Sequence, residues 1–249
     1  MNARVLLPVA LGLLASGPSL AGEISIISAG AVEPGVTAAA EAFRAQTSTA
    51  VKIRFATAPA IRERVGRGEA ADVVIAPPAL IDELAKAGKL DGSGRAAVGR
   101  VGVGVVVRDG TAKPDVSSAD GLKRALLDAD SVVYNKASTG LYLDQLFARL
   151  GVAAQVKAKE TRYPDGAAVM EHVISGKGKE IGFGAITEIR LFADKGAQFV
   201  APLPAETQNY TSYAAAPSTA PANREGAAAF VKFLATPAAR AAFQAKGVE

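Results

Sequence analysis

Few side chains in this sequence could perform acid-base or nucleophilic chemistry. The chain has one histidine, His172, and no cysteine. A Ser-His-Asp triad would need His172, which falls inside a predicted helix over 167–175, where a surface or packing role is the commoner one. Without cysteine, soft transition-metal sites are almost excluded, although carboxylate sites remain open. We therefore expect no catalytic centre, no metal and no cofactor.

Two glycine-rich runs resemble phosphate-binding loops in composition alone. The glycines of 99–104 (GRVGVG) lie inside a β-branched strand, whereas a nucleotide fingerprint needs them at a turn from strand to helix. The run at 176–179 (GKGK) lacks a following Ser or Thr and the spacing of a P-loop. We interpret the first run as a strand and the second as a solvated turn.

The loops that follow predicted strands hold the better candidates for a binding site. In open α/β sheets, such loops line the ligand crevice, and helix N-termini there offer free backbone N–H groups to anions. Four segments are small, polar or glycine-bearing: 28–31 (SAGA), 57–59 (TAP), 135–140 (NKASTG) and 163–166 (YPDG). The ligand-binding candidates within or beside them are Ala29, Gly30, Ala31, Thr57, Ala58, Ser138, Thr139 and Gly166.

Two basic residues near these loops could counter the charge of an anionic ligand. Arg62 follows the second loop, and Lys136 lies within the third. A lone basic residue near a helix start is nevertheless more often a solvated surface charge. For Ser138, Thr139 and Asp165, helix N-capping explains the residue type as well as ligand contact does, and the two roles are compatible.

The elements that must position these loops fall into two β-α series. The apolar run at 72–76 (DVVIA) is typical of a parallel strand covered on both faces. Strands are predicted over 23–28, 51–55, 72–76, 101–107, 131–134, 180–185, 199–203 and 212–216. Helices are predicted over 36–45, 60–67, 80–87, 119–127, 140–150, 167–175, 187–193, 224–234 and 237–246. This alternation predicts α/β sheets flanked by helices.

The first 21 residues are typical of a secretory signal peptide. Arg4 supplies the positive start, residues 5–15 are mostly apolar, and Ser19-Leu20-Ala21 offers small residues at the cleavage positions. This apolar stretch is well short of the roughly 20 residues that a spanning helix needs. We expect cleavage after Ala21 and a mature protein in the periplasm.

Charge and aromatic content argue against nucleic acid as a partner. The 28 Lys and Arg residues face 24 Asp and Glu, a net charge of +4, and the two signs are interleaved. There is no tryptophan, and aromatic residues make up 6% of the chain, so a basic stripe with stacking platforms is absent from the sequence. The length suits one large domain or two small ones, and we expect a monomer.

Five segments, in order along the chain, resemble the periplasmic molybdate-binding proteins of bacterial ABC importers, which are type II solute-binding proteins. The segments are ISAGAVEPGV, VKIRFATAPAIRERVGRGEAADVVIAPPALIDELAKAGKL, STGLYLDQLFARLGV, EIGFGAITEI and AAAFVKFLATPAARAAFQAKGV. The run 68–76 (GEAADVVIA) is the most specific part. The resemblance extends from about residue 24 to the C-terminus, and it implies two α/β lobes that close on an anionic ligand about a hinge.

The sequence departs from this family at three positions where the resemblance implies hydroxyl groups. Ala31 and Ala58 stand in place of serines, and Ala185 stands in place of a tyrosine on the fifth loop. Each donor lost from a buried dianion costs about 1–3 kcal/mol, so molybdate binding should be weak. The alanines also make the pocket larger and more apolar, which suits an organic ligand. Ala185 therefore joins the candidate binding residues.

The sequence thus predicts a divergent molybdate-binding-like protein that captures a small anion for an ABC importer and has no enzymatic activity. Lobe one is expected over 22–106 and 208–249, and lobe two over 107–207. The expected partners are the anionic solute and the importer permease. Three hypotheses stay open: a receptor for molybdate or tungstate, a receptor for a small organic anion such as a carboxylate, and an enzyme on the same scaffold.

Overall fold

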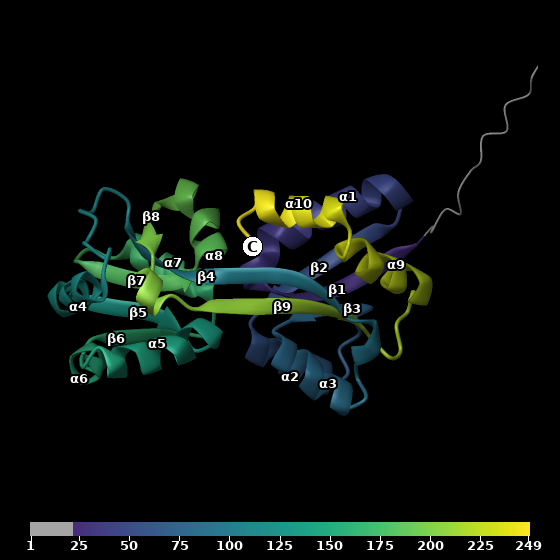
Figure 1. Cartoon of the computed structure of the whole chain (residues 1–249), viewed down its shortest axis with the longest axis horizontal. Helices are drawn as coiled ribbons and strands as arrows, with labels where there is room; N and C mark the ends of the chain where they lie inside the picture. Colours follow the sequence, from purple (N-terminus) through teal and green to yellow (C-terminus); the bar gives the residue numbers. More distant parts are fainter. Residues whose placement is uncertain (1–21) are drawn as a thin grey trace, which may run out of the picture.

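The computed structural model describes residues 22–249, and the expected signal peptide lies outside the described residues. The described chain forms two α/β lobes that lie side by side, joined by long strands that run from one lobe to the other (Figure 1). Within residues 22–249, no helix is both long enough and apolar enough to cross a membrane. The predicted fold class, two lobes that each contain a sheet flanked by helices, is confirmed.

Lobe one is built on three parallel strands in the order β2 (Ala50–Ala56), β1 (Glu23–Ala29) and β3 (Val73–Ala76). Every residue of β3 is buried, as its unbroken apolar run predicts. The sheet continues antiparallel through β9 (Tyr210–Pro217) and the first half of β4 (Ala96–Arg108). Its helices are α1 (Glu33–Thr47), α2 (Ala58–Gly66), α3 (Pro78–Lys86), α9 (Arg224–Leu234) and α10 (Pro237–Ala245), with short 3-10 turns η1 (Gly30–Val32) and η2 (Gly92–Gly94).

Helices cover both faces of this sheet, with α1, α9 and α10 on one side and α2 and α3 on the other (Figure 1). The predicted apolar face of α1 is buried, and its Phe43 meets Phe230 of α9 edge to face, with ring centroids 5.2 Å apart. Ile24 and Ile26 of β1 share one face of the sheet, Ile27 points to the other face, and all three are fully buried. Burying a large aromatic or branched side chain stabilises the fold by about 1.5–3 kcal/mol, so this layer holds the lobe together.

Lobe two repeats the plan with β5 (Ser131–Asn135) between two parallel neighbours, β6 (Glu160–Tyr163) and β7 (Glu180–Ala185). The second half of β4 pairs antiparallel with both β7 and β8 (Ala197–Pro202). Tyr134, Phe147 and Phe183 stack edge to face in its core. The helices are α4 (Ala119–Asp128), α5 (Ser138–Arg149), α6 (Ala153–Lys157), α7 (Gly166–Ser175) and α8 (Ile186–Leu191), with 3-10 turns η3 (Ala193–Lys195) and η4 (Ala205–Thr207).

The lobes share β4, whose two halves belong to different sheets. Residues up to Gly102 pair with β9, and residues from Val103 pair with β7 and β8. At the changeover, the Gln208 side chain brackets Val103: its Oε1 accepts from the Val103 N–H at 2.9 Å, and its Nε2 donates to the Val103 carbonyl at 3.0 Å. The lobe boundaries in residue numbers remain a prediction.

Most predicted elements agree with the structure to within a few residues; the short helix α6 was not predicted, and two strands differ notably. β4 is much longer than the strand predicted over 101–107, because its first half crosses from lobe one. β6 forms where no strand was expected, since its sequence ETRY lacks an apolar alternation and all four of its residues are half-buried. Both differences come from pairing with distant segments, which a local pattern does not contain.

Asp72, in the most specific segment of the sequence, ties three elements together at the start of β3. Its buried carboxylate accepts hydrogen bonds from the Ser25 N–H at 2.7 Å, the Ser25 hydroxyl at 2.8 Å and the Asn223 N–H at 2.9 Å. Burial alone would raise the pKa of Asp72, but the hydrogen bonds from Asn223 and Ser25 together outweigh it and hold the pKa below its ordinary value. The charged form therefore stabilises the fold.

Replacing this carboxylate should destabilise lobe one. We expect Asp72→Asn to lower the free energy of unfolding by about 1–3 kcal/mol at pH 7. The amide NH₂ of Asn would face an N–H or O–H donor where the carboxylate oxygen accepts a hydrogen bond, and the site is buried. Since the folded pKa of Asp72 lies below its ordinary value near 4, the stabilisation is present above that pH and is lost as the pH falls through the folded pKa. Urea unfolding between pH 3 and 7 measures this. The exposed Asp109→Asn is the control, and equal stability of the two variants at pH 7 would contradict the account.

Candidate functional site

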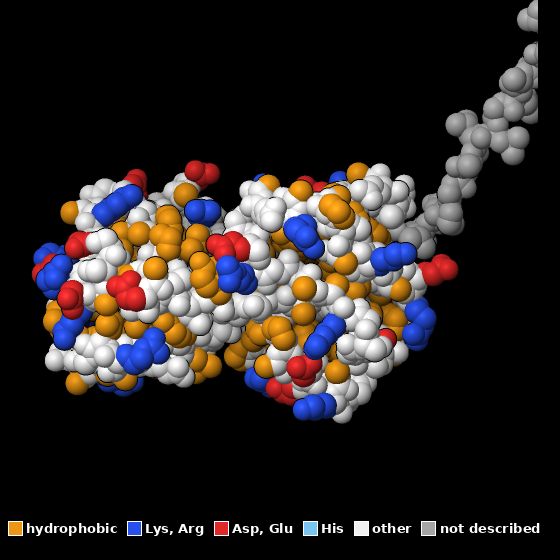
Figure 2. Space-filling view, in the orientation of Figure 1, with side chains coloured by type: hydrophobic (Ala, Val, Ile, Leu, Met, Phe, Trp, Pro, Cys, Tyr) orange, Lys and Arg blue, Asp and Glu red, His pale blue; other side chains and the backbone are white. Residues whose placement is uncertain are grey.

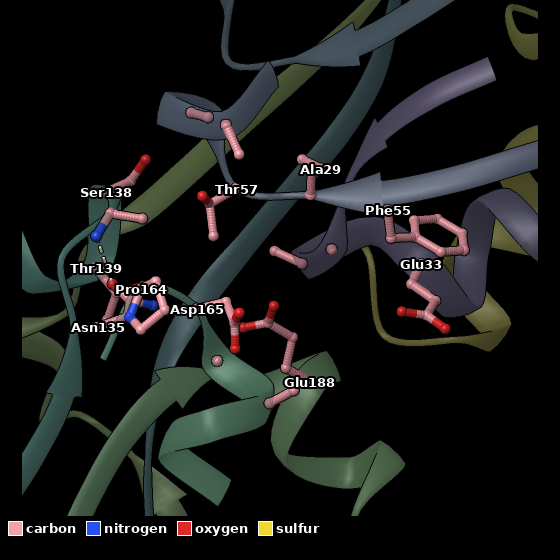
Figure 3. A pocket seen from close by; sticks show the side chains of 18 of the residues that line it. Ala29, Glu33, Phe55, Thr57, Asn135, Ser138, Thr139, Pro164, Asp165 and Glu188 are labelled. Carbon is pink, nitrogen blue, oxygen red and sulfur yellow. Dashed lines mark hydrogen bonds between the residues drawn. The ribbon is translucent and has the colours of Figure 1, made fainter. Parts of the chain in front are cut away.

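A cavity of about 340 Å³ opens between the two lobes, at the carboxyl ends of β1, β2, β3, β5 and β6. It is lined from lobe one by Ala29, Gly30, Ala31, Glu33, Phe55, Ala56, Thr57, Ala58, Ala60, Arg64, Pro77 and Tyr213, and from lobe two by Asn135, Ala137, Ser138, Thr139, Pro164, Asp165, Gly166, Ala167 and Glu188. A crevice at this edge is where α/β proteins bind ligands. Figure 3 shows side chains from both lobes facing the same space.

Besides α1, which follows η1 and begins at the lining residue Glu33, three helices of more than two turns begin at this cavity. Ala58, Ser138 and Gly166 are the first residues of α2, α5 and α7, and all three line it. The N–H groups of a first helical turn have no acceptor within their own helix, and the helix dipole adds a partial positive charge there. The cavity thus receives polar N–H groups from both lobes, an arrangement that suits an anionic ligand.

Of the three residues considered as N-caps, Asp165 has this role, whereas Ser138 and Thr139 do not. Within the described chain, neither Ser138 nor Thr139 caps α5; the Asn135 Oδ1 does so, accepting from the N–H groups of Ala137 at 2.9 Å and Gly140 at 3.2 Å. Asp165 does cap α7, because its Oδ1 accepts from the Ala168 N–H at 2.9 Å. Ser138 and Thr139 are therefore not committed to capping.

Eight of the predicted binding residues line the cavity, and three predicted residues do not. The eight are Ala29, Gly30, Ala31, Thr57, Ala58, Ser138, Thr139 and Gly166. Ala185 is buried at the start of α8 and lies behind the lining, where its N–H donates to the Glu188 carboxylate. Position 185 lacks the tyrosine that the family resemblance implies, but another tyrosine, Tyr213 of β9, lines the same cavity.

The two predicted charge partners lie elsewhere. Arg62 is exposed and makes a two-pronged ion pair with Glu83 of α3, with Nε to Oε1 at 2.7 Å and Nη2 to Oε2 at 2.9 Å. Lys136 is exposed and does not belong to the lining. Arg64 is the arginine of α2 that reaches the cavity, and it also lies 3.8 Å from Glu69. Arg62 and Lys136 thus lie outside the cavity lining, and their role as charge partners of the ligand remains a prediction.

Glu188 of α8 is the most unusual side chain of the cavity. Its carboxyl lies between two glycines of different lobes: a methyl group added at Gly166 would come within 2.5 Å of Oε2, and one added at Gly30 within 3.0 Å of Oε1. Glycine at these positions leaves room for the carboxyl. In Figure 3 the carboxyl groups of Glu188 and Asp165 are turned toward one another. The neighbouring Thr187 hydroxyl donates to the Ala31 carbonyl, which fixes α8 against η1.

Burial raises the pKa of Glu188 from 4.5 to about 7, and the nearby charges of Asp165 and Glu33 add to the shift, although the Ala185 N–H opposes it. Burial likewise raises the pKa of Glu33, against the pull of Lys195. The pKa of Tyr213 is raised by burial and by the charge of Glu188. Glu188 can thus gain or lose a proton near neutral pH, unlike an ordinary carboxyl.

The match to a known protein family covers nearly the whole described chain. The family of bacterial extracellular solute-binding proteins matches residues 24–249. A relative from a Pseudomonas species, named aconitate isomerase, is 31% identical over 255 residues, which span 97% of this chain and 95% of the relative.

Solved structures of similar shape have much lower identity. The periplasmic molybdate-binding protein of Azotobacter vinelandii superposes with a TM-score of 0.75 at 19% identity, covering 91% of this chain and 98% of that one. The L-phospholactate-bound protein PEB3 superposes with a TM-score of 0.69 at 12% identity, covering 90% and 98%. At these identities the likeness shows the shared two-lobed fold.

Neutralising Glu188 should change how stability depends on pH. Because its folded pKa lies above the ordinary value of 4.5, the folded state holds the proton more tightly, and the native protein loses stability as the pH rises from about 4.5 to about 7. We expect Glu188→Gln to remove that loss. Relative to the native protein, the variant should gain about 3 kcal/mol between pH 4.5 and 8, roughly 6–12 °C in Tm.

Thermal unfolding of the ligand-free protein at both pH values measures this difference. The exposed Glu41→Gln on α1 is the matched control and should follow the native protein at every pH. A Glu188→Gln variant whose Tm tracks the native protein across this range would show that Glu188 titrates as an ordinary carboxyl.

Proposed function

Because the chain belongs to the bacterial extracellular solute-binding proteins, we propose that it captures a small organic carboxylate in the cavity between its lobes and delivers it to an ABC importer permease. The observation that carries this proposal is the mixed lining of the cavity. The first residues of α2, α5 and α7 line it, beside the apolar surface of Phe55, Pro77 and Pro164. Such a lining fits a ligand that has a carbon skeleton and charged ends.

The same lining is a poor match for a compact oxyanion. Ala31 and Ala58 contribute methyl groups where hydroxyls would hold the oxygens of a dianion. Three carboxyl groups, of Glu33, Asp165 and Glu188, share the cavity with one arginine, Arg64. A tetrahedral dianion without enough donors loses about 1–3 kcal/mol for each unmet oxygen. A protonated Glu188, by contrast, can donate a strong hydrogen bond to a carboxylate.

Two of the similar proteins carry names that fit this class of ligand, whereas the Azotobacter vinelandii structure is named for molybdate. Aconitate is a small unsaturated tricarboxylate, and L-phospholactate carries a carboxylate beside its phosphate. Both are organic anions too large for a site shaped around a single oxyanion. Aconitate occurs in the name of a sequence relative, and L-phospholactate in the name of a structure with a similar fold. We take propane-1,2,3-tricarboxylate, the saturated counterpart of aconitate, as the first probe ligand.

A second candidate function is isomerisation of a bound carboxylate. The observation that favours it is the relative named aconitate isomerase, which aligns with 97% of this chain. A two-lobed binding protein needs little change to become an isomerase, because it already encloses its ligand and excludes water. The two functions share one cavity and one ligand class, so binding is the first question for both.

Calorimetry with paired arginine variants tests the binding proposal. We expect the saturated tricarboxylate to bind more tightly than molybdate. Arg64→Ala should weaken tricarboxylate binding by about 10-fold, since a charged partner of the ligand is lost. Arg62→Ala on the same helix should stay within about 2-fold, because Arg62 is paired with Glu83 outside the cavity. Submicromolar binding of molybdate together with no binding of carboxylates would contradict the proposal.

Export is the remaining part of the proposal, and it concerns the first 21 residues. We propose that they are removed after Ala21, which would give a mature N-terminus at Gly22 in the periplasm. N-terminal sequencing of the protein recovered from a periplasmic extract checks this. A protein that keeps Met1, or that stays with the cytoplasmic fraction, would contradict it.

A further inference from the structure

We propose that Glu188 is a catalytic residue that moves a proton between two carbons of the bound ligand, so that the cavity interconverts the isomers of an unsaturated tricarboxylate. The inference rests on the proposed carboxylate binding and deepens the second candidate function, because it assigns the reaction to one residue and one proton-transfer step. The substrate class is defined by its chemistry: a carbon-carbon double bond, a CH₂ group next to it, and carboxylates at both ends.

The position of the Glu188 carboxyl carries the inference. It lies between Gly30, at the start of η1 in lobe one, and Gly166, at the start of α7 in lobe two, and all three residues line the cavity. α8 is fixed there by the hydrogen bond from Thr187 to the Ala31 carbonyl. A carboxylate beside an anionic ligand opposes binding by repulsion. A neutral residue at this position would give tighter binding of an anion, so binding alone does not explain the carboxyl group.

Some of the groups around Glu188 are engaged in other hydrogen bonds, and others line the same cavity or shift its pKa. Asp165 faces it from α7 but holds the helix cap with the Ala168 N–H. Glu33 of α1, Arg64 of α2 and Tyr213 of β9 line the same cavity. With its pKa raised to about 7, Glu188 is ionised in part of the molecules at neutral pH, and its conjugate acid can return a proton. A general base works best with a pKa near the working pH.

The proposed step conserves atoms and electrons without any further reactant. The ionised Glu188 removes a proton from the CH₂ group, and the electron pair of the broken C–H bond enters the double-bond system. The resulting allylic anion spreads its charge into the adjacent carboxylate. Glu188 then returns the same proton to the carbon at the other end of the allylic system, where a new C–H bond forms as the double bond shifts. One carboxyl on one face of the ligand suffices for both transfers.

The helix starts supply what this step needs electrostatically. The charge that develops during proton removal lies on carboxylate oxygens of the ligand, which become dienolate-like. First-turn N–H groups at Ala58, Ser138 and Gly166 are fixed in place before the reaction begins. Fixed donors aimed at developing charge lower a barrier more than donors that must reorient.

Proton NMR in D₂O tests the inference on the mature chain. The native protein is incubated with trans-aconitate, and the exchange of CH₂ hydrogens for deuterium is followed together with the appearance of the other isomer. Without protein, the same solution gives the background. We expect exchange and isomerisation well above background, with a rate that rises through an apparent pKa near 7.

The variant Glu188→Gln keeps the shape of the side chain and removes its base. We expect it to bind the saturated tricarboxylate at least as tightly as the native protein at pH 8, because the repulsion is gone, while exchange falls by about 10²–10⁴-fold. Glu188→Asp, which retains a base further from the ligand, should restore part of the exchange. The exposed Glu41→Gln should match the native protein in both measurements.

Three results would overturn the inference, and they separate it from the proposed function. Binding of the tricarboxylate by the native protein without exchange above background would leave the receptor function intact and remove the catalytic one. Full exchange by Glu188→Gln would assign the proton transfer to another group. If the native protein binds no carboxylate, both the proposed function and the inference fail.

Discussion

The cavity depends on the two strands that run from one lobe to the other. β4 and β9 pair over Ala96–Gly102, and from Val103 onward β4 joins the sheet of lobe two. This pairing turns the carboxyl ends of the parallel strands of both lobes toward the same space. Helices α2, α5 and α7 begin at these ends, and their first residues line this space from both lobes. The anion-binding character of the cavity therefore follows from topology before any side chain is considered.

The charge balance of the cavity explains why one side chain, Glu188, decides what the site can do. N–H groups at helix starts favour an anion, whereas Glu33, Asp165 and Glu188 oppose it. On the face seen in Figure 2, basic and acidic side chains are interspersed, whereas the cavity has three carboxyl groups and one arginine. Protonation of Glu188 relieves the conflict when a ligand enters. The same capacity to release and recover a proton is what carbon acid chemistry requires.

The sequence predicts the location of the cavity better than its chemistry. Parallel strands end at the same edge of a sheet, so loops that follow them are expected to lie together. This expectation locates the loops at 28–31, 57–59, 135–140 and 163–166. Arg62 and Arg64 show the limit. Two residues apart on a helix is about 200° of rotation, so the two side chains lie on nearly opposite faces, and a prediction of α2 without its orientation cannot choose between them.

Glu188 was not predicted at all, for a physical reason. It sits inside the segment EIGFGAITEI, which the sequence assigns to a strand and a helix, and nothing local distinguishes it from an exposed helical glutamate. Its role arises from contacts with Gly30 and Gly166, more than 150 and 20 positions away along the chain. One signal was available, since glycines at both strand ends leave space that some larger group must fill. Recognising which group fills it requires the tertiary structure.

The central claim is that a small carboxylate is held by helix starts of both lobes at once, and ¹⁵N NMR of backbone amides tests it most directly. On titration with propane-1,2,3-tricarboxylate, the account predicts that the amide signals of Gly30, Ala58, Ser138 and Gly166 shift together and saturate at one ligand concentration. Shifts confined to one lobe, or saturation at different concentrations in the two lobes, would contradict it.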